Sequence, residues 1–297
     1  MIKVAVEYGC SRDFDEEGQD NMKNYILEVC ADSVESALSA KAGGANRLEL
    51  CANLVIGGTT PGYELFEQVK EETGLPIRVL IRPRFGDFLY SEYEYQQMLH
   101  DVRHFAEAGA DGVVIGSLNA DGTLNEVQMR GLIQAAGGCG ITLHRAFDVC
   151  ADPFAALQRA AKLGVDTILT SGQEADCLQG RELIRQLVRA AQDSSSDGRE
   201  TAALPEGVTI LVGAGVVSSN IKEIAMTTGT HAFHMSGKKL TDSGMRFRNE
   251  RVHMGIEGLS EFELYRTDEE EIRRASRILQ TMDAEDVPEE SIGGTGA

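Results

Sequence analysis

The 297-residue chain twice repeats a pattern of a glutamate followed two residues later by a cysteine, at Glu28 and Cys30 and again at Glu49 and Cys51. Each pair closes a short apolar segment of the kind that forms a buried strand. Neighbouring strands lie about 4.8 Å apart, so matched strand ends could bring the two thiols together. Thiolates are soft ligands that suit Cu(I). A buried cysteine is also a common small apolar residue, so a packing role stays open.

Further polar residues fall at the ends of other apolar segments. Alternate residues of a strand face opposite sides, and the leucines, valines and isoleucines of these segments suit the side that packs on helices. The polar residues that then point inward, or lie just beyond the strand, are Glu28, Glu49, Arg82, His144 and His234, with Arg84, Arg145 and Asp148. A buried charge without a partner costs several kcal/mol. Gathering so many at one end therefore favours a functional site over a structural ion-pair network, which is the alternative.

These residue types can carry acid–base chemistry. Glu28, Glu49 or His144 could transfer a proton, and the arginines could bind an anion. His144, Arg145 and Asp148 form one strand-to-loop run, which predicts a role in a reaction or in ligand binding. We expect an inward His144 beside two carboxylates to have a raised pKa.

Small polar and glycine-rich turns follow the last three apolar segments. Barrel proteins often bind phosphate in such turns, and the helix that begins near Ser219 or Asn220 could add its N-terminal dipole. The same glycines could simply mark tight turns. The residues predicted to bind an anionic cofactor or ligand are Ser171, Gly172, Gly213, Gly215 and Ser236.

The elements that must position these residues recur in a regular order. Seven times a helical pattern stops at a glycine, a small or polar residue follows, and an apolar strand begins. Alternating helices and strands favour parallel pairing. Eight units closing on themselves give a (β/α)8 TIM barrel, with an open doubly wound sheet as the alternative. The predicted strands are Tyr25–Cys30, Arg47–Cys51, Ile77–Arg82, Gly112–Gly116, Ile141–His144, Thr167–Thr170, Thr209–Val212 and His231–Met235.

The chain divides into one domain with extensions. Residues 1–24 are predicted to be an N-terminal extension, 25–282 the barrel with a C-terminal helix, and 283–297 an acidic, glycine-rich, disordered tail. Residues 193–205 are a polar insertion before the seventh strand. Loops of that kind lie on the face of a barrel away from its chemistry, so we expect no catalytic role there.

Composition excludes several classes of function. The formal net charge of -19 and the absence of tryptophan argue against binding to nucleic acid or to anionic lipid. No apolar run approaches the roughly 18 residues of a membrane span, and the acidic N-terminus is unlike a signal peptide. We therefore expect a cytoplasmic protein whose six cysteines are mostly free thiols.

Taken together, the motifs resemble the CutC family. The likeness runs from about Tyr25 to Asn249 and rests on Leu27–Cys30, Arg47–Cys51, Gly57–Pro61, Ile81–Arg84, Gly86–Phe88, His144–Asp148, Leu169–Gly172 and Ser243–Asn249. The resemblance implies a cytoplasmic barrel that handles copper and self-associates. It also places Cys30 and Cys51 on the positions proposed as Cu(I) ligands.

Three functions follow as hypotheses. The first is copper homeostasis, with Cu(I) bound at the barrel mouth by Cys30 and Cys51. The second is an enzyme that acts on a small anionic substrate carrying phosphate or carboxylate, with Arg82, Arg84 and Arg145 as anion clamps. The third is a hydrolase or isomerase that uses a harder divalent metal held by glutamate and histidine. No strand ends in lysine, which argues against a Schiff-base aldolase.

Overall fold

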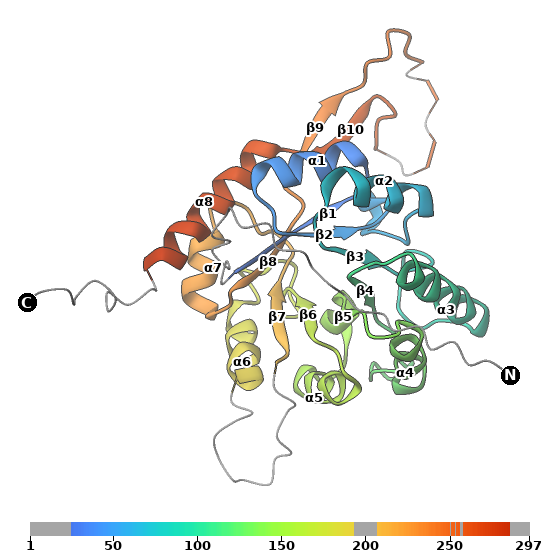
Figure 1. Cartoon of the computed structure of the whole chain (residues 1–297), viewed down its shortest axis with the longest axis vertical. Coiled ribbons are helices and arrows are strands. Elements are labelled where there is room, and N and C mark those ends of the chain that lie inside the picture. The colour runs from blue at the N-terminus through green and yellow to red at the C-terminus, as the bar shows by residue number, and fades with distance from the viewer. Residues whose placement is uncertain (1–24, 193–206, 250, 253, 256–257, 286–297) are drawn as a thin grey trace, which may run out of the picture.

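The computed structural model describes residues 25–192, 207–249, 251–252, 254–255 and 258–285. Eight parallel strands pair in sequence order, and the eighth pairs with the first to close the barrel (Figure 1). The predicted (β/α)8 fold is confirmed, and the open sheet is excluded. The strands are β1 Ile26–Ala31, β2 Arg47–Leu50, β3 Ile77–Leu80, β4 Gly112–Ile115, β5 Gly140–Leu143, β6 Thr167–Thr170, β7 Thr209–Val212 and β8 Ala232–Met235.

The helices form the outer layer of the barrel. Their starts follow local chemistry: Asp152 accepts hydrogen bonds from two backbone amides at the start of α5, and Pro153 occupies its first turn. The last helix, α8, packs beside α1 and α7 (Figure 1). The helices are α1 Val34–Gly43, α2 Tyr63–Thr73, α3 Glu92–Glu107, α4 Glu126–Ala135, α5 Pro153–Leu163, α6 Arg181–Gln192, α7 Ile221–Thr228 and α8 Glu269–Glu285, with short 3-10 turns η1 Leu54–Ile56 and η2 Arg145–Val149.

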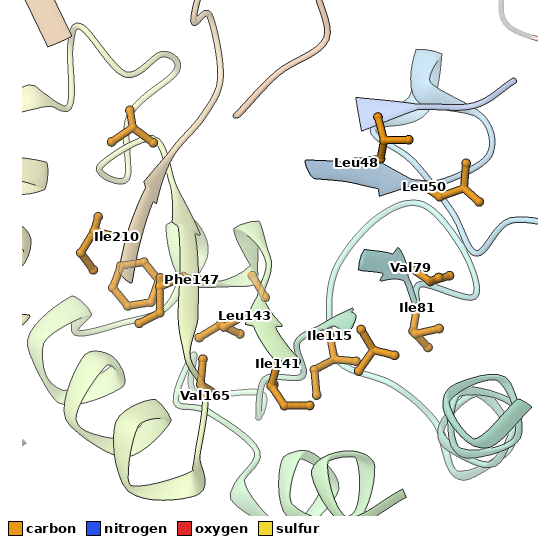
Figure 2. Packing of buried hydrophobic residues seen from close by; sticks show 14 of the residues in the cluster. Leu48, Leu50, Val79, Ile81, Ile115, Ile141, Leu143, Phe147, Val165 and Ile210 are labelled. Atoms are coloured by element: carbon orange, nitrogen blue, oxygen red, sulfur yellow. The ribbon is translucent and has the colours of Figure 1, made fainter. Parts of the chain in front are cut away.

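The main core lies between the strands and the helices. Leu48 and Leu50 of β2, like Ile141 and Leu143 of β5, belong to this cluster, and Figure 2 shows such residues along successive strands. Because alternate residues point the other way, the intervening positions fill the barrel interior. Among the described residues the interior holds two small apolar clusters, and polar side chains fill much of the remaining space.

Arg78 fills the amino end of the barrel interior. Its guanidinium donates to Asp166 at 2.7 Å, Thr142 at 2.6 Å and Thr167 at 3.3 Å, which ties β3 to β5 and β6. The side chains of the carboxyl end therefore rest on a layer that is already hydrogen-bonded.

Two further strands were not predicted. β9, Lys238–Asp242, and β10, Glu263–Thr267, form an antiparallel pair outside the barrel, beside α1 (Figure 1). The predicted extension at 1–24, the insertion at 193–205 and all of the tail beyond residue 285 lie outside the described residues. Within the described part of the chain, none of the helices is long and apolar enough to cross a membrane.

Candidate functional site

A buried carboxylate ties together three strands at the centre of the barrel. Glu28 accepts a hydrogen bond from Arg47 Nε at 2.5 Å, and its other oxygen lies 2.8 Å from His234 Nδ1. Burial by itself would raise the pKa of Glu28, but the Arg47 charge and the contacts with His234 outweigh it and lower the pKa to about 2. Glu28 is therefore ionised at neutral pH. It is also hidden from the cavity described below, because its oxygens face two cationic partners.

Above this network, three possible metal ligands meet. One ligand atom each from Cys30, Glu49 and His234 lies within 4.8 Å of the other two. Cys30 and Glu49 are paired residues of β1 and β2, and His234 reaches them from β8. The inward orientations predicted for these residues agree with this arrangement.

The charges in this group are coupled. Burial raises the pKa of Glu49 to about 7, with a further contribution from the charge of Glu28, while His234 and Arg47 act against it. Burial disfavours a charged His234, but the negative charge of Cys30 and Glu49 and the hydrogen bond to Glu28 raise the pKa of His234 well above its ordinary value. Proton exchange near neutral pH is therefore available at Glu49.

Cys51 lies next to this group but is not one of the three. It is fully buried behind the cavity wall, in a small cluster with Leu80 and Val114, and its Sγ lies 3.5 Å from the Ala31 carbonyl oxygen. Burial, followed by the negative charge of Cys30, raises the pKa of the Cys51 thiol well above its ordinary value. A metal must displace that proton to bind Cys51.

The carboxyl ends of the strands open into a cavity of about 1220 Å³. Of the predicted site residues, those that line it are Cys30, Glu49, Arg82, His144, Arg145, Asp148, Gly215, His234 and Ser236. Glu28, Cys51, Ser171, Gly172 and Gly213 do not line it. Arg84 is also outside the cavity wall, because it extends to Glu94 and Asp87.

Asp148 holds the loop that follows β6. Its carboxylate accepts hydrogen bonds from Thr170 Oγ1 at 2.5 Å, Ser171 N at 3.0 Å and Gln173 N at 3.2 Å, and it pairs with Arg145 at 2.7 Å. The segment from His144 to Asp148, which follows β5, is therefore hydrogen-bonded to the end of β6 and the loop after it. In this geometry the Asp148 oxygens are engaged by the protein itself.

The prediction of a raised pKa for His144 is wrong. His144 does not contact the two carboxylates; it lies after β5, with its ring 4.8 Å from that of Phe88. Burial, followed by the charge of Arg82, lowers its pKa to about 3. Its Nδ1 accepts a hydrogen bond from Ala146 N at 3.1 Å. His234, from the opposite end of the sequence, holds the position beside Glu28 that we expected for His144.

The ring of His144 is seated against a glycine of the neighbouring strand end. A Cβ atom on Gly116 would lie 2.5 Å from His144 Cε1 and 2.6 Å from Nδ1. No real side chain tolerates such contacts, so the ring position requires glycine at 116.

A carboxylate from α8 already occupies backbone and hydroxyl donors in the loop after β7. Glu271 of α8 accepts hydrogen bonds from Ser218 N at 2.6 Å and Ser218 Oγ at 2.9 Å. These are donors that a bound phosphate would use. Binding of an anion by Gly213, Gly215 and Ser236 stays a prediction.

Sequence reasoning missed several residues of this region. Arg47 is two residues before Glu49 on the same strand, so the alternation of a strand could have predicted that it faces the barrel interior. Arg78 is likewise two residues before the inward-facing Leu80. Glu271 gave no such signal, because its role depends on how α8 folds back over the barrel.

We predict that the His144 imidazole stays neutral with its proton on Nε2 from about pH 8 down to about pH 5. The unfolded chain takes up a proton near the ordinary value of 6.5, whereas folded His144 does so only near 3. His144 therefore contributes stability above pH 6.5 that is lost progressively as pH falls toward 3.

Ring 15N chemical shifts measured over this range test the prediction, with His144→Asn used to assign the signals. A His144 signal that titrates between pH 6 and 8 would contradict it.

Comparison with known proteins gives a consistent result. A model of the CutC family matches residues 25–239. A CutC family protein of Parabacteroides distasonis is 46% identical over 250 residues, which cover 84% of this chain and 98% of the relative. The human copper homeostasis protein cutC homolog is 39% identical over 259 residues, covering 87% of this chain and 90% of the relative.

A solved structure agrees with the computed one. The crystal structure of a CutC protein from Streptococcus agalactiae is 28% identical, has a TM-score of 0.64 and covers 71% of this chain and 98% of that chain. The family match extends over most of the chain and includes every residue of the group formed by Cys30, Glu49 and His234. This chain belongs to the CutC family.

Proposed function

We propose that the chain serves copper homeostasis in the cytoplasm and binds Cu(I) at the barrel mouth. The observation that carries the proposal is the group of Cys30, Glu49 and His234, whose ligand atoms lie within 4.8 Å of one another on the cavity wall. In this proposal copper is the cargo of the protein and not a resident cofactor. Cys51 is the second thiol, positioned directly behind the group.

The chemistry of these donors favours Cu(I) over a harder metal. Thiolate is the ligand type that selects Cu(I), and imidazole suits copper as well, whereas magnesium and calcium prefer sites built from oxygen ligands. Glu49 supplies the group's one carboxylate. The hypothesis of a harder metal held by glutamate and histidine is therefore less well supported than Cu(I).

Glu28 supports the proposed site from below. A histidine that binds a metal usually gives its other ring nitrogen to a carboxylate, which fixes the ring and its tautomer. Glu28 contacts His234 Nδ1 in this way and leaves Nε2 toward Glu49, 3.9 Å from its Oε2. Because the pKa of His234 is raised well above its ordinary value, Cu(I) would have to replace a proton of that ring, so binding should release a proton.

We predict that Cys30→Ser weakens Cu(I) binding by at least about 100-fold, since loss of a ligand should cost no less than loss of a residue that supports one. Cys51→Ser should also weaken binding, and the double variant should be weaker than either single one. Competition with a chromophoric Cu(I) chelator under reducing conditions measures these affinities.

Cys139→Ser is the matched control, because Cys139 precedes β5 at the opposite end of the barrel. Its affinity should equal that of the unmodified protein. Unchanged Cu(I) affinity in the double variant of Cys30 and Cys51 would refute the proposed site.

Self-association is a further part of the proposal, supported by the arm that β9 and β10 form. Its exposed apolar side chains include Leu240, Met245 and Phe247, of which Phe247 is 79% exposed. Such a gathering is typical of a contact surface. We predict a homo-oligomer that Phe247→Asp with Leu240→Asp shifts toward monomer in analytical ultracentrifugation.

Val127→Asp on α4 is the control for this experiment, because Val127 is also exposed but lies outside the arm. A monomeric unmodified protein, or an oligomer that the arm variants leave intact, would count against the arm as the interface.

An enzyme acting on a small anionic substrate is the second candidate function. One observation favours it: the cavity of about 1220 Å³ is far larger than a metal ion requires, and Glu49 shares it with Arg82, Arg145 and Arg274. Glu49 is then the residue that could transfer a proton, since Glu28 is held ionised by its partners and His144 is neutral.

We predict for this candidate that the protein converts at least one member of a panel of small phosphorylated and carboxylated compounds, followed by proton NMR. Glu49→Gln should abolish the conversion, whereas Glu174→Gln, on the loop after β6 and outside the cavity wall, should not. If a high concentration of the protein converts none of the compounds in the panel, the result would argue against an enzymatic function.

A further inference from the structure

Two buried nitrogen atoms on one wall of the cavity have no hydrogen-bond partner among the described residues. They are Nε of Arg82, after β3, and Nε2 of His144, after β5. Their residues are 8% and 4% exposed, and both line the cavity. A buried donor left unpaired costs about 1–3 kcal/mol. Two of them on the same wall indicate a place where a ligand atom completes the bonding.

Both nitrogens are donors, which decides the kind of ligand. Nδ1 of His144 accepts a hydrogen bond from Ala146 N, so the proton of the neutral ring is on Nε2. The guanidinium of Arg82 is always charged and only donates. A metal cation would be repelled by that charge and would find no free lone pair on Nε2. An oxygen atom that carries negative charge satisfies both groups.

The structure fixes both donors in place before any ligand arrives. Arg82 donates to the carbonyl oxygens of Gly57 and Gly58 at 3.1 Å each and to that of Gly86 at 2.9 Å. These bonds use both terminal nitrogens of the guanidinium, and Nε is left without a hydrogen-bond partner. No carboxylate among the described residues forms an ion pair with Arg82, so carbonyl dipoles and the ring of Phe88 stabilise its positive charge.

Phe88 brings the two side chains to the same wall. The guanidinium carbon of Arg82 lies 5.1 Å from the centre of its ring, and the His144 ring lies 4.8 Å from it. Leu54 and Leu80 line the same cavity and give it apolar surface. A ligand that fits here has a negatively charged group and an apolar part.

We propose that Nε–H of Arg82 and Nε2–H of His144 bind the carboxylate or phosphate group of a small organic anion in this cavity. The inference rests on the second candidate function for its biological meaning, since it names where the substrate's charged group is held. Binding and conversion are separate measurements, so one can fail without the other. The site shares the cavity with the group of Cys30, Glu49 and His234 but uses none of those three residues.

A pair of substitutions at His144 distinguishes this role from a structural one. His144→Asn can keep an acceptor near the position of Nδ1, for the amide of Ala146, but loses the donor at the position of Nε2. His144→Gln reaches the position of Nε2 with an amide donor but loses the bond to Ala146. A purely structural histidine would be replaced better by asparagine, and an anion-binding one by glutamine.

The probes are inorganic phosphate and acetate, titrated into the full chain by calorimetry, with melting temperatures recorded for every variant. We expect saturable binding of at least one anion. His144→Asn should weaken it by about 10-fold or more, the cost of a hydrogen bond to a charged group, whereas His144→Gln should stay within about 3-fold. Binding of phosphate alone, or of acetate alone, identifies which group the site selects.

A second pair of variants tests the arginine and does not depend on how His144 variants fold. Arg82→Lys keeps the charge and loses Nε, so it should weaken binding by about 10-fold. Arg159→Lys, on the outer helix α5 where the side chain pairs with Glu126 of α4, should leave binding unchanged. The proposal is overturned if neither anion saturates the site below about 10 mM, if Arg82→Lys binds normally, or if His144→Gln loses as much affinity as His144→Asn.

Discussion

The ionised carboxylate of Glu28, buried in the middle of the barrel, is the constraint on which the carboxyl end depends. An isolated charge there would cost several kcal/mol, so it must have cationic partners. Arg47 meets one oxygen and His234 meets the other. These contacts join β1, β2 and β8 at the point where the barrel closes. They also fix the orientation of His234, and through it the geometry around Cys30 and Glu49.

Charge on the cavity wall is divided between two regions. The wall near β1, β2 and β8 carries a thiol, a carboxylate and an imidazole held by Glu28, and these are groups that bind a metal. The wall near β3 and β5 carries Arg82 and neutral His144, whose unpaired ring and guanidinium nitrogens, Nε2 and Nε, are hydrogen-bond donors. A chain with a net charge of -19 therefore keeps a small region where an anion is favoured. Low solvent access strengthens both kinds of interaction relative to water.

Arginines and glycines of the surrounding loops maintain this division. Arg82 is held by backbone carbonyls, Arg145 is held by Asp148, and Glu271 fills the donors beside the β7 turn. Ser218 and Glu271 are 53 positions apart and Arg82 and Gly57 are 25 apart, whereas Arg145 and Asp148 are only three apart. The loops are thus cross-linked by polar contacts, while the apolar core between strands and helices supplies most of the burial. This separation allows the cavity to be polar without weakening the barrel.

The sequence by itself determined the eight strands, the order of helices and the inward direction of Glu28, Cys30, Glu49 and His234. These follow from local rules, because apolar alternation, helix caps and glycine turns act within a few residues. The pairing of β1 with β8, and hence the contact of Glu28 with His234, was decided by closure of the barrel, which joins residues 206 positions apart.

The same reason explains the error at His144: parity placed it inside, but only the tertiary structure showed that its neighbours are Phe88 and Arg82 and not the carboxylates. The arm formed by β9 and β10 and the contact of Glu271 with Ser218 likewise arose from chain segments that no local pattern connects. A pKa, a cavity wall and an ion pair depend on which side chains meet across strands. Those distances exist only once the chain has folded.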